Sequence, residues 1–213
     1  MGLGKCCATL PHKNQEQAAQ CILSLPRLVA LLLHLLHSVH CHFFVQSVRI
    51  YDSTCDSVAT FFHNAAVLDA SFGPSSGQVF SGGLDRLVRA WDVTRGSGSK
   101  GDALGEHGKP IKCIKYCSAL NVVASGSWDA TIATWDARQS GSSGARAASI
   151  SAPERIYSMD YNDASGQPLL AAACARQNLA AYDLRTPDAP LISSQFSSPK
   201  HMLRRVTFSQ AGT

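Results

Sequence analysis

The strongest constraint on this chain is a polar and aromatic pattern that recurs after 44 residues. The segments 81–92 (SGGLDRLVRAWD) and 125–136 (SGSWDATIATWD) are copies of one unit, each preceded by a histidine at the same distance. Internal repetition at this period is typical of repeat architectures in which one small unit is stacked on the next. Without a gap, the first set of residues recurs as the second: His63, Ser81, Asp85, Trp91 and Asp92, then His107, Ser125, Asp129, Trp135 and Asp136.

A third and weaker copy follows 47 residues later, in the segment 172–183 (AACARQNLAAYD). It keeps the aromatic residue and the final aspartate, but Glu154 stands in place of the histidine and Arg176 in place of the first aspartate. We expect Glu154 and Arg176 to form an ion pair that replaces the lost contacts.

Each unit is built from short β-branched segments bounded by Gly, Ser, Asn and Pro, which favours strands over helices. Four short strands in a period of about 40–45 residues are typical of a β-propeller blade. The fold class predicted is therefore an all-β, incomplete β-propeller over residues 46–213. Its expected units are about 46–64, 65–108, 109–152, 153–197, and the start of another at 198–213.

Residues 1–45 differ from the rest, because Arg27 is the only charged residue between Glu16 and Arg49. The apolar run 28–45 raises the question of a membrane span or signal peptide. The four histidines in its second half argue against a span, and we expect no membrane partner. Leucine and alanine dominate the run, so it is expected to be helical or poorly ordered.

Two histidines of this leader, His34 and His37, are three residues apart and could share a helix face with Cys41. A metal site is conceivable there. The alternative is a histidine-containing apolar segment that packs on the domain, and this is the interpretation we favour, so no metal is predicted.

Composition excludes some classes of protein. The net charge of the 213 residues is only +4, and no basic and aromatic strip is present, so no direct nucleic-acid partner is expected. The eight cysteines contain no CxxC pair, which favours reduced intracellular thiols over a disulfide scaffold or a zinc site. Gly-rich phosphate loops are absent from the sequence, and no cofactor is predicted.

The recurring polar residues have a mechanical explanation. Asp129 would accept a hydrogen bond from His107, whose other nitrogen reaches Ser125, and this serine would meet the indole N–H of Trp135. Buried polar groups need such partners. The same chain of contacts is predicted one unit earlier for His63, Ser81, Asp85 and Trp91.

A serine, a histidine and an aspartate in one unit also suggest a catalytic triad. A catalytic constellation needs to occur only once, whereas a structural network recurs with every blade. The repeat therefore favours scaffolding, no catalytic residue is assigned, and the chain is predicted not to be an enzyme.

These motifs resemble WD repeats and, more narrowly, the mitotic checkpoint WD-repeat proteins of the budding-uninhibited-by-benzimidazole group. The resemblance covers roughly residues 46–213. It is carried by AVLDASF (66–72), SGGLDRLVRAWD (81–92), the run 107–138 with YCSALNVVASGSWD, PERIYSMDY (153–161), YDLR (182–185) and SSPKHMLRR (197–205). The sister family of messenger-RNA export propellers, which bind nucleoporins, shares HxxPIK and GSWD but fits SGGLD and WDAR less well.

The resemblance implies a seven-bladed propeller, of which about three and a half blades are present here. It implies a non-enzymatic adaptor of the spindle assembly checkpoint, which binds short motifs of checkpoint kinases and phosphothreonine peptides of a kinetochore scaffold. Ubiquitin or components of the anaphase-promoting complex are further partners by family. The expected location is the nucleus and kinetochore, and in part the cytoplasm. The alternative is an adaptor for messenger-RNA export.

Four residues are the candidate peptide-binding site. Leu84 and Trp128 precede the aspartates of the tight turns and are expected at the top rim, although Trp128 could instead pack between blades. Arg204 matches the family arginine that contacts phosphate, with Lys200 nearby. The alternative is a solvated basic strand end formed by Lys200, Arg204 and Arg205.

The chain departs from the family pattern at both ends. The first blade lacks its opening strands, with Val45 at the position of the tight-turn aspartate, and Thr213 comes about one strand into the next blade. Closed rings protect sheet edges. We therefore expect the isolated chain to form an open arc that aggregates, dimerises or represents a shortened product.

Overall fold

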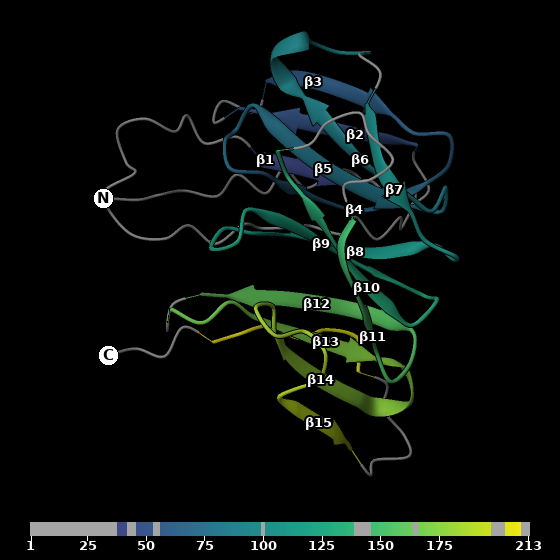
Figure 1. Ribbon diagram of the computed structural model, residues 1–213. Coiled ribbons are helices and arrows are strands. Elements are labelled where there is room, and N and C mark those ends of the chain that lie inside the picture. Colours follow the sequence, from purple (N-terminus) through teal and green to yellow (C-terminus); the bar gives the residue numbers. More distant parts are fainter. Residues whose placement is uncertain are drawn as a thin grey trace, which may run out of the picture.

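The computed structural model describes residues 38–41, 46–52, 56–98, 101–138, 146–163, 166–196 and 203–209. Within these residues the chain forms fifteen strands and two short 3-10 helices, arranged as four separate antiparallel sheets. The sheets follow one another in chain order through the molecule (Figure 1). The predicted all-β architecture is thus confirmed, with sheets of the kind that make up propeller blades.

The first sheet has three strands in the order β1-β2-β3. They are β1 (Ser38–Cys41), β2 (Ser47–Tyr51) and β3 (Ser57–Phe62). The predicted helix is therefore wrong at residues 38–41, because this segment pairs antiparallel with β2, with Val39 opposite Ile50. Pairing with the strand that follows in the sequence outweighs local helix propensity here. The rest of the leader, including His34 and His37, lies outside the described residues.

The other three sheets each have four strands joined as a meander. The second contains β4 (Val67–Phe72), β5 (Gln78–Gly83), β6 (Leu87–Asp92) and β7 (Asp102–Glu106), with η1 (Val93–Arg95) after β6. The third contains β8 (Ile111–Cys117), β9 (Val122–Ser127), β10 (Thr131–Asp136) and β11 (Arg146–Ser151). The fourth contains β12 (Ile156–Asn162), β13 (Leu169–Cys174), β14 (Asn178–Asp183) and β15 (Ile192–Gln195), with η2 (Ala175–Gln177) before β14.

The repeat is also present in the backbone of the tight turns. Arg86, in the turn between β5 and β6, has φ 66°, and Ala130, 44 residues later in the turn between β9 and β10, has φ 65°. Positive φ is uncommon outside glycine and is favoured in two-residue hairpin turns, because it matches the twist of the flanking strands. Both turns therefore have the same geometry and hold the preceding aspartate in the same position.

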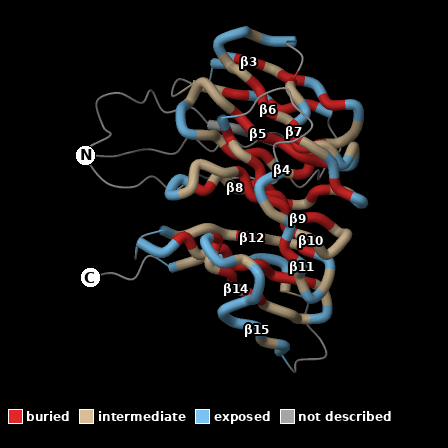
Figure 2. The backbone as a smooth tube through the Cα atoms, in the orientation of Figure 1, coloured by how far each residue is buried: buried red, intermediate tan, exposed pale blue. Residues whose placement is uncertain are grey.

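The core lies between adjacent sheets rather than inside any one of them (Figure 2). Phe61 of β3 stacks on Trp91 of β6, with ring centroids 5.0 Å apart, and so joins the first sheet to the second. Trp135 packs in a cluster with Phe80 and Val88 of the second sheet. A third cluster unites apolar residues of the third and fourth sheets. Each sheet is consequently stabilised by burial against its neighbours.

The first strands of successive sheets lie next to one another, β4 beside β8 and β8 beside β12. Side chains connect them. Asp69 of β4 accepts a hydrogen bond from the backbone N–H of Ile114 at 2.8 Å, and the Ser71 hydroxyl accepts one from Tyr116 at 3.4 Å. The sheets are therefore linked by polar contacts along these strands as well as by the apolar clusters.

The segment 203–209 continues this series. The backbone N–H of Val206 donates to the Ser158 hydroxyl at 3.2 Å, and that of Phe208 donates to the Asp160 carboxylate at 2.8 Å. The segment thus lies along β12 as β8 lies along β4. The described residues show no sheet partner for it, and it is not assigned as a strand.

Candidate peptide-binding rim

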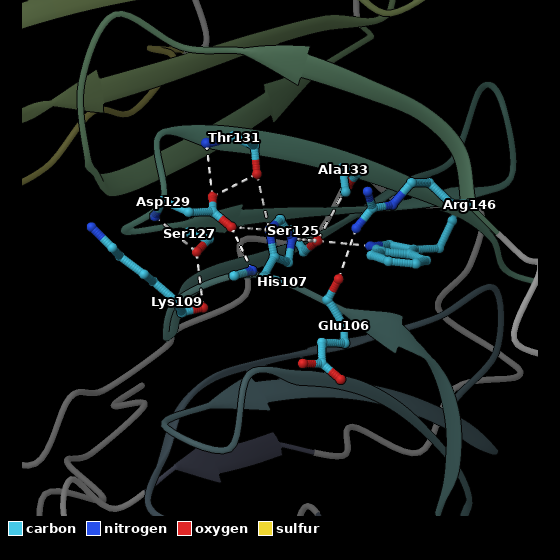
Figure 3. A network of polar contacts seen from close by, with 11 residues as sticks. Glu106, His107, Lys109, Ser125, Ser127, Asp129, Thr131, Ala133 and Arg146 are labelled. Atoms are coloured by element: carbon cyan, nitrogen blue, oxygen red, sulfur yellow. Dashed lines mark hydrogen bonds and ion pairs between the residues drawn. The ribbon is translucent and has the colours of Figure 1, made fainter.

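A hydrogen-bonded chain of four side chains crosses the third sheet (Figure 3). His107 follows β7, Ser125 lies on β9, Trp135 lies on β10, and Asp129 is in the turn between β9 and β10. Nδ1 of His107 is 3.2 Å from Asp129 Oδ2, and its Nε2 is 2.7 Å from Ser125 Oγ. The Trp135 indole N–H donates to the same hydroxyl at 2.7 Å. The structure therefore brings together the four residues that the repeat singled out.

The protonation states of Asp129 and His107 define the direction of the hydrogen bonds in this network. Burial acts to raise the pKa of Asp129, but hydrogen bonds from Thr131 and the proximity of His107 outweigh it, so the pKa lies below its ordinary value. The ionised carboxylate only accepts hydrogen bonds, so Nδ1 of His107 carries the proton and Nε2 accepts from the Ser125 hydroxyl. Burial lowers the pKa of His107 although Asp129 opposes this, which keeps the imidazole neutral at pH 7.

An equivalent chain crosses the second sheet. Nδ1 of His63 is 2.9 Å from Asp85 Oδ2, and its Nε2 is 2.6 Å from Ser81 Oγ. The indole N–H of Trp91 donates to Ser81 at 2.6 Å. Arg89, which has no counterpart in the hydrogen-bonded network of the third sheet, lies 3.4 Å from the Asp85 carboxylate. Burial raises the pKa of Asp85, but its hydrogen bond with His63 and the charges of His63 and Arg89 lower it overall.

The burial of the serine and the histidine argues against a catalytic triad, whereas the order of the residues in the sequence does not. Ser125 has no exposed surface and His107 is 2% exposed, so no substrate carbonyl can approach the serine oxygen in this structure. The same oxygen is already engaged by the Trp135 indole. A nucleophile requires a reacting atom within reach of both itself and its base. In this position the serine, histidine and aspartate can connect strands but cannot act on a ligand.

The fourth sheet has lost this network. Ala172 replaces the serine, and Tyr182 replaces the tryptophan and donates its hydroxyl to the Ser151 carbonyl at 3.2 Å. The expected ion pair is present, with Arg176 Nε 3.3 Å from Glu154 Oε1. The Arg176 side chain is 77% exposed, so this pair lies on the surface and is not a buried substitute.

Two contributors to the polar chain were not predicted. The Thr131 hydroxyl lies 2.6 Å from Asp129 Oδ1 and 3.0 Å from His107 Nδ1. Its position two residues after the aspartate is a signal that could have identified it. The Arg146 guanidinium lies 4.9 Å from the centre of the Trp135 ring and donates to the Glu106 carbonyl at 2.7 Å. No sequence signal points to Arg146, because its role depends on how two sheets meet.

Leu84 and Trp128 occupy equivalent places in the turns of the second and third sheets. The N–H of Leu84 donates to the Ala66 carbonyl at 2.9 Å, and that of Trp128 donates to the Pro110 carbonyl at 3.0 Å. Both turns therefore lie at the same end of their sheets, beside the start of the first strand. We call this end the rim, defined by Leu84, Trp128 and the start of segment 203–209.

The two rim side chains differ in exposure. Leu84 is 41% exposed. Trp128 is partly buried, and its indole nitrogen is covered and has no hydrogen-bond partner within the described structure. Trp128 thus packs partly against its neighbours, and its role as a peptide anchor stays a prediction.

Arg204 is the second residue of segment 203–209 and is exposed, as is Arg205. Lys200 lies outside the described residues. The bond of Val206 to Ser158 places Arg204 at the end of β12 that begins with Ile156, which is the rim end.

Metal, membrane and thiol chemistry add little to this picture. In the part of the chain that is described, three or more potential metal ligands nowhere gather into one cluster. No helix among those same residues is long and apolar enough to cross a membrane. Cys117 and Cys174 are buried free thiols, and burial raises their pKa to about 12 and about 11. They are accordingly protonated and packed in the core at neutral pH.

Comparison with known proteins defines the class. Residues 55–92 and 98–136 match the family described as WD domain, G-beta repeat. These two segments are therefore WD repeats, which agrees with the stacked four-stranded sheets and the repeated polar network of the structure.

Comparison with individual proteins shows which WD-repeat proteins the chain is similar to. The chain is 37% identical over 171 residues to the mitotic checkpoint protein BUB3.1 of Arabidopsis thaliana, covering 78% of this chain and 47% of that protein. It is 31% identical over 147 residues to the poly(A)+ RNA export protein of Schizosaccharomyces pombe, covering 66% of this chain and 39% of that protein. The mitotic checkpoint protein bub-3 of Caenorhabditis elegans is 26% identical, over 71% of this chain and 41% of its own length. The chain spans about half the length of the curated relatives it matches, and the resemblance to the checkpoint and export groups is confirmed.

Proposed function

We propose that this WD-repeat chain is a non-enzymatic adaptor of the mitotic spindle checkpoint that binds short motifs of checkpoint kinases at its rim. The proposal rests on which side chains are buried and which lie at the rim. The serine and histidine of both polar chains are buried, whereas the tight turns they support present Leu84 and Trp128 at one end of adjacent sheets. Two apolar side chains on rigid turns suit a short peptide that runs across the sheets.

Trp128 is the central anchor in this proposal. The part of the Trp128 ring that stays exposed would contact an apolar side chain of the peptide. Leu84, on the neighbouring sheet, would contact a second apolar side chain of the same peptide. The similarity to mitotic checkpoint proteins of two organisms supports the choice of a checkpoint-kinase peptide.

Phosphothreonine peptides of a kinetochore scaffold are the second proposed ligand. Arg204 is exposed at the rim end of the extended segment, and a guanidinium can hold a phosphate through two parallel hydrogen bonds. Lys200 is proposed to contribute a second positive charge. Ubiquitin and the anaphase-promoting complex remain proposed partners by family, and the nucleus and kinetochore, with some cytoplasm, are the proposed locations.

Peptide binding by fluorescence anisotropy tests the anchor. A labelled peptide carrying the checkpoint-kinase motif should bind the full chain, and Trp128→Ala should weaken binding by at least tenfold. Ser149→Ala, an exposed change on β11, serves as the matched control and should bind as the parent does. Equal affinities of the Trp128→Ala and parent proteins would contradict the proposal.

A separate experiment tests the proposed phosphate-binding role of Arg204. A phosphothreonine peptide should bind more tightly than its unphosphorylated form, and Arg204→Ala should remove that difference. Arg138→Ala changes an exposed arginine that is paired with Asp136 after β10, so it should leave the difference intact. An unchanged preference for the phosphorylated peptide in Arg204→Ala would dismiss this role.

The alternative function is an adaptor for messenger-RNA export, and the 31% identity to an RNA export protein favours keeping it. The same rim would then bind a nucleoporin peptide. Competition between labelled kinase-motif and nucleoporin-motif peptides decides between the two, because the peptide bound more tightly identifies the branch.

A further inference from the structure

A cavity of about 360 Å³ lies on the second sheet, at the end opposite the rim. Leu84 of the rim is in the turn after β5, whereas the cavity is lined where β5 begins and β6 ends. The loop before β5, η1 and the start of β7 also contribute to its lining, through Ser75, Arg95 and Asp102. Its volume falls in the range of small-ligand sites. Its lining contains no residue of the two rim turns, so the cavity is separate from the proposed peptide site.

Asp102 departs from the repeat at this cavity. It lies opposite Ala90, the residue that precedes Trp91 on β6. The same place, opposite the residue before the recurring aromatic, is occupied in the other sheets by Ala59, Ala148 and Ile192. Three of the four sheets thus have an apolar side chain where the second sheet has a carboxylate. The stacking of the sheets therefore does not require an acid at this position.

Gln78 is a second departure from the repeat in the same cavity. It lies opposite the aspartate that ends β6, a place that Val122 takes in the third sheet and Leu169 in the fourth. Paired and alternate residues of neighbouring strands share one face, so Gln78 and Asp102 lie on the same side of the second sheet. Gln78 Nε2 donates to the Ala137 carbonyl at 3.0 Å, and within the described structure its Oε1 accepts no hydrogen bond. The cavity therefore offers an amide oxygen as well as a carboxylate.

The charges around the cavity are unequal. The Asp92 carboxylate is engaged, because it accepts a hydrogen bond from the Thr94 N–H at 2.9 Å and lies 3.3 Å from Arg95 Nε. Asp102 is half-buried, and among the described residues its side chain has neither an ion-pair partner nor a hydrogen-bond donor. A partly desolvated carboxylate in a concave site attracts a cation more strongly than one on an open surface. The cavity is thus complementary to a positive charge.

We propose that this cavity binds an arginine side chain of a partner protein. The planar guanidinium has five donors, of which two can pair with the Asp102 carboxylate while others reach Gln78 Oε1 and the Ser75 hydroxyl. These acceptors come from three separate segments, which suits a fork of donors better than the point charge of a lysine. The methylene stem of the arginine would pack against Ala90. This site goes beyond the proposed function, because it lets the chain hold a second partner at the end opposite the rim.

Titration of the full chain with Nα-acetyl-arginine methylamide, followed by amide NMR, gives the first test. Saturable shifts should occur at Gly77, Gln78 and Asp102, and Asp102→Ala should weaken binding at least fivefold. That variant introduces the residue found at the equivalent place of the third sheet, so its urea midpoint should match the parent's. Asp188→Ala, which removes an exposed acid after β14, is the control and should bind as the parent does. Equal affinity of the parent and Asp102→Ala would overturn the proposal.

Two further comparisons test the chemistry and the location of the site. Capped citrulline, which has nearly the same shape without the charge, should cause no saturable shift, and capped lysine should bind more weakly than capped arginine. Equal binding of either compound would overturn the assignment to arginine. The arginine compound should not displace the labelled kinase-motif peptide, and Asp102→Ala should bind that peptide as the parent does. Displacement would contradict a separate site, whereas a chain that binds arginine and no kinase peptide would refute only the proposed function.

Discussion

The indole N–H of Trp135 donates to the hydroxyl of Ser125 at 2.7 Å, and this bond joins the second strand of the third sheet to the third strand. The serine hydroxyl is fully buried and donates a hydrogen bond to His107. One oxygen therefore connects two strands and a loop. Buried networks of this kind are costly when any member loses its partner.

Ser125→Ala should therefore destabilise the protein by about 1–3 kcal/mol, because the Trp135 and His107 nitrogens both lose their partner. Urea unfolding followed by circular dichroism measures the change. Ser149→Ala, on the exposed side of β11, should stay within about 0.5 kcal/mol of the parent. Equal midpoints for the two variants would show that the chain of contacts contributes nothing to stability.

Stability should decrease as the solution is acidified below pH 6.5. Burial holds the pKa of His107 below its ordinary value of 6.5, so the unfolded chain binds more protons than the folded one from pH 6.5 down to the folded pKa. The lowered pKa values of Asp85 and Asp129 add a second loss below 3.8, as pH falls through their folded values. Urea unfolding at pH 8, 7, 6 and 5 should show the first decrease, and His107→Gln should make it shallower. An identical slope in that variant would rule out His107 as the source.

Gly105→Ala should be strongly destabilising. A Cβ at this position on β7 would lie 2.0 Å from Cζ3 of Trp135, which is buried and cannot move aside. Overpacking of this kind costs about 1–3 kcal/mol or more. Gly77→Ala is the control, because its nearest neighbour would be at an ordinary 3.6 Å. Similar melting temperatures for the two variants would mean that the second and third sheets do not meet at this glycine.

The exposed ion pair of the fourth sheet should contribute little. Arg176→Gln is expected to change the free energy of unfolding by no more than about 1 kcal/mol, because the arginine is largely solvated. Asp129→Asn, at the equivalent position of the third sheet, should cost about 1.5–3 kcal/mol through loss of bonds to a charged carboxylate. Chemical denaturation of both proteins under identical conditions provides the comparison, and the reverse order would show that Arg176 has a buried role.

The Asp160 carboxylate should hold segment 203–209 in place. Asp160→Ala removes the acceptor of the Phe208 N–H and of the Thr207 hydroxyl, so the Phe208 amide should exchange with solvent at least tenfold faster. Asp183→Ala, which removes a surface acceptor at the end of β14, should leave this amide unchanged. Hydrogen–deuterium exchange with mass spectrometry reads out both, and an unchanged Phe208 rate in Asp160→Ala would show that the segment is held by other contacts.

Local sequence rules were sufficient wherever the repeat is intact. The short β-branched segments of these units, which were expected to be strands and not helices, form among others β4, β8 and β10. The two histidine–serine contacts also follow from spacing, because equivalent residues on stacked units take equivalent positions. Both results depend on a pattern that occurs twice.

The failures share a physical cause, which is that they depend on pairing and packing between elements and not on the local composition of one segment. Residues 38–41 form a strand because β2 is available to pair with them, and the leucine-rich sequence before them gives no sign of it. Arg146 lies opposite Trp135 on the paired strand β11, after a register shift between Thr134 and Trp135, and it reaches the Glu106 carbonyl because β11 passes beside the end of β7 of the second sheet. The half-buried state of Trp128 likewise depends on how adjacent turns pack.

The contacts from Asp69 to Ile114 and from Asp160 to Phe208 run only between immediate neighbours in the row of sheets. Such a row behaves like a short one-dimensional array, in which each member is held from two sides except at the ends. Among the described sheets, the second and third, which carry Trp91 and Trp135, have a described neighbour on both sides, so their backbone amides should exchange with solvent more slowly than those of the first and fourth.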